Sequence, residues 1–377
     1  MPAAHDFSMM LVELGAALIG LAILARIASR WGISSIPLYL LAGLAFGEGG
    51  LAPLKLSHGF ISTGAEIGVL MLLFMLGLEY SGDQLRENLR TGIPAGIVDF
   101  VLNFPPGLIA GLLLGWKILP AVLLGGVTWI SSSGIISKVL SELGRQSNVE
   151  MPQILSILVL EDLAMAVYLP VVGVLIAGGG PAKIAIDVGI AIGAVLVVLL
   201  VALRYGQRWS AAIAHESDEI VLLSTFGTVL LVAGLAQRVQ VSAAIGAFLV
   251  GIAVSGPIAE QSHRLLAPLR DLFAAVFFFF FGLQIDPSTL PRVLPAAFAL
   301  AAITAFTKVA TGYWSARRAG VDPRGRWRTG AALVARGEFS MVIAGLGTAL
   351  EPALGPFSAA YILLLAIAGP VVARLVK

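Results

Sequence analysis

Long apolar runs, separated by short charged or Gly- and Pro-rich segments, repeat along the whole chain. An apolar run of about 20 residues is long enough to cross a bilayer as a helix. The pattern therefore predicts an all-α polytopic membrane protein with about 13 transmembrane helices. The predicted helices span residues 8–27, 34–48, 60–78, 92–115, 119–141, 154–177, 184–203, 218–236, 241–256, 268–285, 291–314, 327–348 and 357–373.

The distribution of Lys and Arg between alternate loops predicts how these helices are oriented, because cytoplasmic loops carry the excess of both residues. With the N-terminus outside, the inner loops hold 17 Lys and Arg residues and the outer loops hold 5. This bias predicts an odd number of spans, with an external N-terminus and a cytoplasmic C-terminus. The chain does not start with a basic segment and a cleavage site, so we expect the first apolar run to remain as a helix.

Composition excludes several classes of function. Hydrophobic residues make up 58% of the chain, charged residues 12%, and the mean hydropathy is +0.95. Cysteine is absent, which excludes disulfides, thiolate metal sites and cysteine nucleophiles. The four histidines fall near predicted helix ends, which argues against a histidine metal centre. We expect no cofactor, and we attribute the net charge of +2 to the loop asymmetry rather than to binding of nucleic acid.

Glu161 and Asp162 lie in the middle of the predicted helix 154–177, which is otherwise apolar. Carboxylates at membrane depth are costly and commonly mark ion or proton pathways; the alternative is a structural pair bridged to neighbouring helices. Because successive helical residues point about 100° apart, the two side chains cannot face one small cavity equally. We expect Asp162 to face the ion and Glu161 to face Lys308 or the backbone. Burial favours the protonated form of a carboxylate, so a proton and a cation can compete at Asp162.

Two predicted helices are interrupted by polar or flexible residues, one over residues 125–134 and the other over residues 335–340. Non-helical backbone at membrane depth is tolerated only where it lines a polar cavity or is buried in protein. Either stretch alone also fits a small-residue packing face between helices. The polar residues of the two stretches are Thr128, Ser131, Ser132, Ser133, Arg336, Glu338 and Ser340.

The two interruptions occupy matching positions in the chain. If the helix at 184–203 is a connector, the six predicted helices before it and the six after it form halves of opposite topology, each interrupted at its fifth helix. Matching interruptions in inverted repeats point to the binding site of a transporter. The symmetry predicted in this way is one of hydropathy and interruption, not of residues.

Helix geometry places Asp162, Lys308 and Arg336 at similar depths, each about 12–15 Å from the cytoplasmic boundary. The serine hydroxyls of the first interruption, together with freed backbone carbonyls, suit a hard monovalent cation. We interpret Arg336 and Glu338 as a structural clamp on the second interruption, with direct ion contact as the alternative. Lys308 is expected to pair with Glu161.

Two further features are interpreted as packing. Asp99, in the predicted helix 92–115, is expected to be a hydrogen-bonded packing residue, with support of the transport core as the alternative. The five phenylalanines from Phe277 to Phe281 are expected to face lipid or to pack at an interface, with an aromatic cage for an organic cation as the weaker alternative.

Five short motifs occur along the chain in an informative order: Phe74–Glu79, Ser131–Ser133, Leu160–Asp162, Phe277–Gly282 followed by Asp286, and Arg336–Phe339. In this order and spacing they resemble those of the monovalent cation:proton antiporter superfamily. The chain is similar to the branch that holds Kef-type potassium/proton and bacterial sodium/proton antiporters. The resemblance covers essentially the whole chain.

The resemblance implies a sodium/proton antiporter-like fold with two crossed broken helices, and it implies a homodimer. In the family, the acidic residue that matches Asp162 binds cation and proton alternately, and a lysine of the eleventh helix matches Lys308. One subdomain would move against the other during transport. The implied transport subdomain covers about 92–177 and 291–373, and the dimerisation subdomain about 8–78 and 218–285, with 184–203 as the connecting helix.

Glu161 departs from the family pattern. Many Kef-type members have Gln at this position, whereas many electrogenic sodium antiporters have a second Asp, so the ion and the stoichiometry stay open. Kef-type proteins also carry a C-terminal nucleotide-binding domain, and this sequence ends at Lys377. A cytoplasmic regulatory domain or subunit is therefore an expected partner that the sequence does not include.

The expected function is exchange of a monovalent cation, with potassium favoured, for protons across the membrane lipid, without enzymatic activity. Sodium/proton exchange is the first alternative. A passive channel usually needs a pore ring or a repeated filter sequence, which this chain does not show. An intramembrane hydrolase using Asp162 with Asp99 or Glu338 would lack a serine–base pair or a histidine metal site. A proton-coupled symporter for an organic solute is the remaining alternative.

Overall fold

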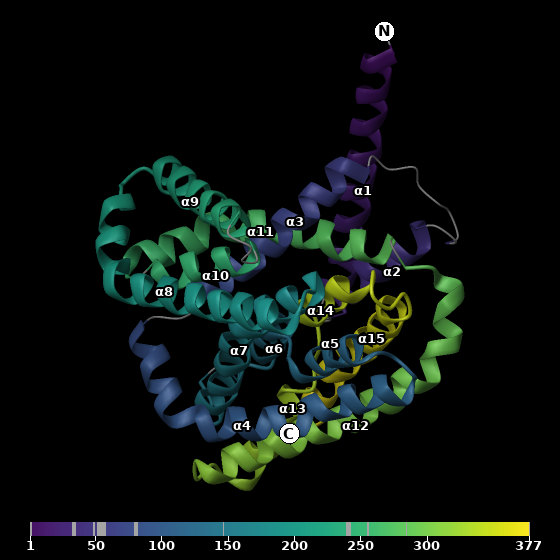
Figure 1. Ribbon diagram of the computed structural model, residues 1–377, viewed down its shortest axis with the longest axis vertical. Helices are drawn as coiled ribbons and strands as arrows, with labels where there is room; N and C mark the ends of the chain where they lie inside the picture. The colour runs from purple at the N-terminus through teal and green to yellow at the C-terminus, as the bar shows by residue number, and fades with distance from the viewer. Residues whose placement is uncertain are drawn as a thin grey trace. The chain divides into compact units, whose positions relative to one another are not determined.

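A computed structural model describes residues 2–31, 35–47, 50, 58–78, 82–145, 147–238, 243–254, 256–283 and 285–376. The regular secondary structure of these residues is helical, as the apolar pattern predicts (Figure 1). The elements are α1 (Pro2–Arg30), α2 (Ile36–Phe46), α3 (His58–Leu78), α4 (Gly82–Leu113), α5 (Ile118–Trp129), α6 (Ser133–Glu142), α7 (Met151–Ala177), α8 (Pro181–Ile213), α9 (Asp218–Arg238), α10 (Ala243–Ala253), α11 (Pro257–Leu283), the 3-10 helix η1 (Pro287–Thr289), α12 (Leu290–Arg318), α13 (Pro323–Ala332), α14 (Glu338–Gly347) and α15 (Leu354–Leu375).

Eight segments in the described part of the chain are long and apolar enough to cross a membrane. The segments predicted from the apolar pattern each fall on a helix or on a broken pair of helices. The total of about 13 crossings stays a prediction. The eight segments are Leu11–Arg30, Gly92–Leu113, Ile118–Ile136, Met151–Ala177, Asp218–Arg238, Pro257–Leu283, Pro287–Arg318 and Leu354–Leu375.

Both predicted interruptions are real breaks in the helices. α5 ends at Trp129 and α6 begins at Ser133, and the backbone between them is extended at Ile130, with φ −75° and ψ 134°. α13 ends at Ala332 and α14 begins at Glu338. The first break, over residues 130–132, is narrower than the predicted stretch 125–134. The second break, over residues 333–337, begins and ends earlier in the chain than the predicted stretch 335–340.

The glycines of the first stretch explain part of this difference. Gly125 and Gly126 remain inside α5 and are buried. A Cβ on Gly125 would lie 2.8 Å from the ring of Phe104, so this glycine permits close packing of α4 on α5 and does not end the helix. The second break begins at Leu333, two residues before the predicted stretch.

Local signals fix the entry into α13, the helix that leads to the second break. Asp322 is the N-cap, and its Oδ2 accepts a hydrogen bond from Arg324 N at 3.1 Å. Pro323 follows at the first helical position, where its missing N–H costs nothing. α12 ends just before, with Arg317 and Arg318 in its last turn, where cations interact favourably with the negative end of the helix dipole.

The chain divides into two compact units, here called unit 1 and unit 2. Unit 1 comprises residues 1–63, 94–158 and 275–377, and unit 2 comprises residues 64–93 and 159–274. In unit 1, α15 packs against α5, α6, α12, α13 and α14, so that both broken helices lie around it. In unit 2, α8, α9 and α10 contact one another. The predicted division into transport and dimerisation subdomains stays a prediction.

Each unit contains a close crossing between two glycine-bearing helices at which a short sequence pattern is repeated. In unit 1, α2 meets α11, and a Cβ on Gly43 would lie 2.2 Å from the carbonyl oxygen of Phe279. In unit 2, α3 meets α10, and a Cβ on Gly77 would lie 2.3 Å from the carbonyl oxygen of Phe248. The pattern Phe-x-x-Gly-Leu occurs at both places, at 74–78 and 279–283. Both copies of the pattern therefore lie at a close contact between helices, and the inverted repeats stay a prediction.

The phenylalanine run of α11 is more buried than predicted. Phe277, Phe278, Phe279 and Phe281 are all below 9% exposed within this single chain. Phe279 packs with Leu21 and with partly buried residues of α2. These four side chains therefore do not face lipid, and their burial agrees with the alternative expectation that the run packs at an interface.

Candidate functional site

The two breaks cross each other inside unit 1. The backbone N–H of Ser132 donates to the carbonyl of Ala335 at 2.9 Å, and Ser131 Oγ donates to the carbonyl of Leu333 at 3.3 Å. A Cβ on Gly337 would lie 2.5 Å from Ser132 Oγ, so a glycine is needed where the segments touch. The non-helical backbone is thus buried in protein, as it must be at membrane depth.

Arg336 ties the two breaks together. Its side chain is fully buried, and its Nη1 donates to the carbonyls of Leu333 at 3.0 Å and Val334 at 3.2 Å. Its Nη2 donates to the carbonyl of Thr128 at 3.0 Å. These carbonyls lie at the C-terminal ends of α13 and α5, where backbone acceptors have no helical partner and carry partial negative charge. The guanidinium of Arg336 therefore donates hydrogen bonds to carbonyls at the ends of both half-helices.

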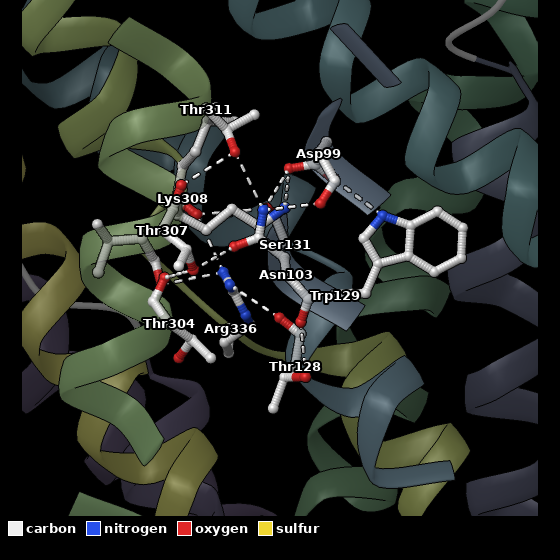
Figure 2. A network of polar contacts seen from close by, with 12 residues as sticks. Asp99, Asn103, Thr128, Trp129, Ser131, Thr304, Thr307, Lys308, Thr311 and Arg336 are labelled. Atoms are coloured by element: carbon white, nitrogen blue, oxygen red, sulfur yellow. Dashed lines mark hydrogen bonds and ion pairs between the residues drawn. The ribbon is translucent and has the colours of Figure 1, made fainter. Parts of the chain in front are cut away.

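A buried ion pair lies beside the crossing. Lys308 Nζ on α12 is 2.6 Å from Asp99 Oδ1 on α4, and both side chains are 0% exposed. Asn103 Nδ2 donates to the same Oδ1 at 3.0 Å, and Trp129 Nε1 donates to Oδ2 at 2.9 Å. Figure 2 shows these donors converging on one carboxylate.

Asp99 is a partner of Lys308 that the sequence analysis did not assign to it. The expected pairing of Lys308 with Glu161 stays a prediction. Depth along a helix restricts which layer a charge occupies, but it does not say which of several carboxylates in that layer faces the lysine. Asp99, interpreted from sequence as a packing residue, is the centre of this cluster.

Hydroxyl groups extend the cluster along one face of α12. Thr304, Thr307, Lys308 and Thr311 follow the spacing of neighbours on a helix surface. Thr307 Oγ1 donates to Asn103 Oδ1 at 2.7 Å, and Asn103 Nδ2 donates to Thr311 Oγ1 at 3.1 Å. The Asn103 side chain therefore joins α4 to α12 on both sides of the ion pair (Figure 2).

Two further contacts join α5 and α15 to the same cluster. Thr128 Oγ1 donates to the carbonyl of Asn103 at 2.9 Å. The hydroxyls of Thr304 and Tyr361 share a hydrogen bond at 2.8 Å. The buried polar groups of four helices are thereby connected, which fixes the positions of these helices around the crossing.

The residues predicted for the site divide between the units. Thr128, Ser131, Ser132, Ser133, Lys308 and Arg336 all lie in unit 1, around the crossing or the ion pair. The backbone of Glu338 starts α14, and its side chain lies outside the described residues. Glu161 and Asp162 belong to unit 2, where each is 2% exposed on α7. That Glu161 and Asp162 lie at the same membrane depth as the crossing stays a prediction.

Asn103 and Trp129 were not predicted from the sequence. Asp99 and Asn103 are four residues apart, so they lie on the same face of an apolar helix, and this spacing was an available signal. Trp129 gave no comparable signal, because an indole in a membrane helix is ordinarily a packing residue.

Comparison with known proteins identifies the family. A family model described as the transmembrane part of sodium/hydrogen exchangers matches residues 16–377. The chain belongs to this family. The resemblance to the monovalent cation:proton antiporters is thereby confirmed, and the protein is a multi-pass cation/proton antiporter.

Two relatives and one solved structure illustrate the similarity. The K(+)/H(+) antiporter subunit KhtU of Bacillus subtilis (strain 168) is 36% identical over 375 residues, which cover 96% of this chain and 92% of KhtU. The high-affinity Na(+)/H(+) antiporter NhaS3 of Synechocystis is 30% identical over 380 residues, covering 89% of this chain and 78% of NhaS3. The sodium proton antiporter MjNhaP1 from Methanocaldococcus jannaschii has a similar fold, with a TM-score of 0.73 at 18% identity, covering 98% of this chain and 99% of MjNhaP1.

Proposed function

We propose that this antiporter exchanges potassium for protons by alternating access at Asp162. The crossing of the two breaks carries the proposal, because it gathers serine hydroxyls and backbone carbonyls in a buried place. Oxygen atoms of this kind are the ligands that unwound transporter helices offer to alkali cations. The similarity to the potassium antiporter subunit KhtU supports potassium, and the similarity to NhaS3 supports sodium as the second candidate.

Competition at a single carboxylate is sufficient for exchange. Asp162 lies on the apolar helix α7 and is 2% exposed, so a bare negative charge there is costly. The site crosses the membrane when a cation or a proton neutralises it, and crossing empty is disfavoured. In this proposal Glu161 points to a different side of α7, because neighbouring residues of a helix are about 100° apart.

We assign the fold two inverted repeats joined by α8, with the broken helices at corresponding positions. The Phe-x-x-Gly-Leu pattern at 74–78 and 279–283 supports this, since both copies lie at a glycine crossing. A transport subdomain (about 92–177 and 291–373) moves against a dimerisation subdomain in a homodimer. The protein lies in a bacterial inner membrane with its N-terminus outside, in agreement with the loop charges. KhtU is described as a subunit, which supports a cytoplasmic regulatory partner.

Fluorescence dequenching in everted vesicles tests the choice of ion. Each alkali cation is added in turn to vesicles whose interior has been acidified. The dye signal of the same vesicles without added cation gives the background. Potassium should dequench the dye at the lowest concentration. A lower half-maximal concentration for sodium would favour the second candidate. Cation flux that does not respond to an imposed pH gradient would contradict antiport altogether.

A further inference from the structure

The turn between α12 and α13, two helices of unit 1 that pack side by side, carries uncompensated positive charge (Figure 1). Residues 313–328 contain five arginines and a single acidic residue, Asp322, whose carboxylate caps α13. Arg317, Arg318 and Arg324 are exposed, and none of the three forms an ion pair with another described residue. The turn therefore presents a basic surface to its surroundings.

Aromatic rings lie between these arginines. The ring of Tyr313, near the end of α12, is 5.0 Å from the ring of Trp327 on α13, and the guanidinium of Arg326 lies 6.0 Å from the centre of the Tyr313 ring. The guanidinium of Arg318 lies 5.8 Å from the centre of the Trp314 ring. Stacking uses the face of a guanidinium, so N–H groups at its edge stay available to an anion such as phosphate.

The stacked rings also bring arginines of both helices together. Arg317 is one helical turn after Tyr313, and Arg324 is one turn before Trp327. Both arginines therefore lie beyond the rings, toward the turn. Arg326 Nε donates to a backbone carbonyl of the turn at 2.7 Å, which holds this third guanidinium in place.

An apolar stripe of α12 leads directly to this basic surface. Ile303 and Phe306 are 52% and 73% exposed, and Tyr313 and Arg317 follow on the same face of the helix, because α-helical residues seven and eleven positions apart point in similar directions. The segment Pro287–Arg318 is long and apolar enough to cross a membrane. The stripe is therefore expected to contact acyl chains, and its end at Tyr313 and Arg317 is expected to lie at the level of the lipid headgroups.

We propose that the α12–α13 turn binds an anionic phospholipid, with the phosphate among Arg317, Arg324 and Arg326 and an acyl chain along Ile303 and Phe306. A phospholipid matches both parts of this surface, whereas a soluble anion or an acidic protein segment matches only the charge. The sequence predicts that this turn is cytoplasmic, and the cytoplasmic leaflet holds the anionic lipids that attract basic segments next to the membrane.

The bound lipid would hold the start of α13, the half-helix that ends at the second break. This role does not depend on which ion the protein exchanges, nor on Asp162 as the shared site. The lipid inference and the proposed function can therefore fail separately.

Titration of the purified full chain with phosphatidylglycerol, followed by native mass spectrometry, tests the proposal. Arg317→Gln combined with Arg324→Gln should weaken binding by about thirtyfold, which corresponds to ~1 kcal/mol for each arginine. Replacement of both by lysine should restore most of the affinity, because a lysine binds phosphate as a point charge. Arg292→Gln is the matched control, since Arg292 is exposed at the opposite end of the same helix.

Several outcomes would overturn the proposal. Parental affinity in the double glutamine variant would exclude this surface, and an equal loss in Arg292→Gln would indicate a general effect of charge. Glycerophosphoglycerol, which is the same headgroup without acyl chains, should bind far more weakly than the lipid, and equally tight binding would identify a soluble anion as the occupant. Tighter binding of a polyglutamate peptide would favour an acidic protein segment.

Thermal unfolding in detergent accompanies the titrations. Both arginines are exposed, so the variants should unfold at the parental midpoint. If the double variant is less stable, each single replacement provides the same test, with an expected loss of about fivefold in affinity. Parental affinity in both single variants would also overturn the proposal.

Discussion

At the scale of single residues, the three serines of the first break differ in what their hydroxyls do. Ser132 Oγ accepts a hydrogen bond from the backbone N–H of Ile135 at 3.2 Å, which is the bond of a helix N-cap at the start of α6. Ser131 Oγ donates to the carbonyl of Leu333 across the crossing, and Ser133 is the first residue of α6. The three hydroxyls therefore have different contacts, and their common role as cation ligands stays a prediction.

Substitutions by alanine should separate these roles. Ser132→Ala should cost ~1 kcal/mol of stability through the lost cap and leave the apparent cation affinity nearly unchanged. Ser131→Ala combined with Ser133→Ala should raise the KM for the cation by about tenfold, because each hydroxyl contact contributes ~0.5–1.5 kcal/mol. Dequenching titrations and thermal unfolding in detergent measure the two quantities. Equal KM values in all variants would mean that backbone carbonyls alone bind the cation.

Asp162 carries the proposed exchange, so its neutral analogue gives a direct prediction. Asp162→Asn should fold and insert, and its cation-driven proton flux should fall to the vesicle background, because an amide cannot bind a proton in competition with a cation. Asp271→Asn is the matched control, since its side chain is 70% exposed. Robust exchange by Asp162→Asn would exclude Asp162 as the shared site.

At the scale of helices, the glycine crossings bring two helix backbones very close together. A Cβ on Gly77 would lie 2.3 Å from a backbone oxygen of α10, and backbone cannot move aside as a flexible side chain can. Gly77→Ala should therefore destabilise the protein by ~1–3 kcal/mol, the usual cost of overpacking. Gly189→Ala in α8 is the control, because nothing lies within 4 Å of its Cβ position. The measurement is the thermal unfolding midpoint of each purified variant. Equal midpoints for the two variants would contradict the close approach of α3 and α10.

At the scale of the whole molecule, the orientation in the membrane follows from loop charge and is directly testable. The natural sequence contains no cysteine, so a single introduced cysteine is the only thiol available for labelling. Lys183 and Arg324 are both exposed, in the first turns of α8 and α13, and the sequence predicts that they lie on opposite sides of the membrane. A membrane-impermeant maleimide should label Lys183→Cys from outside the cell and Arg324→Cys only in everted vesicles. Labelling of both variants from one side would require a different number of spans between them.

The sequence by itself determined the positions of the helices and the existence of both breaks. Hydropathy is a local property of each segment. An apolar run such as 154–177 is long enough to cross the bilayer as a helix whatever its neighbours are. Glycine, serine and charged residues at membrane depth weaken a helix by the same local rule. The order of the motifs also sufficed to indicate the antiporter family.

Only the tertiary structure decided the partners of the buried charges. The bond between Lys308 and Asp99 depends on how α12 packs against α4, and on Asn103 and Trp129, which bond the same carboxylate. In the same way, the carbonyls that Arg336 binds belong to two segments about 200 residues apart in the chain, brought together by packing. Charges and carbonyls act through space over a few ångströms, whereas the sequence pattern specifies only the helix, the depth and the approximate face on which each group lies.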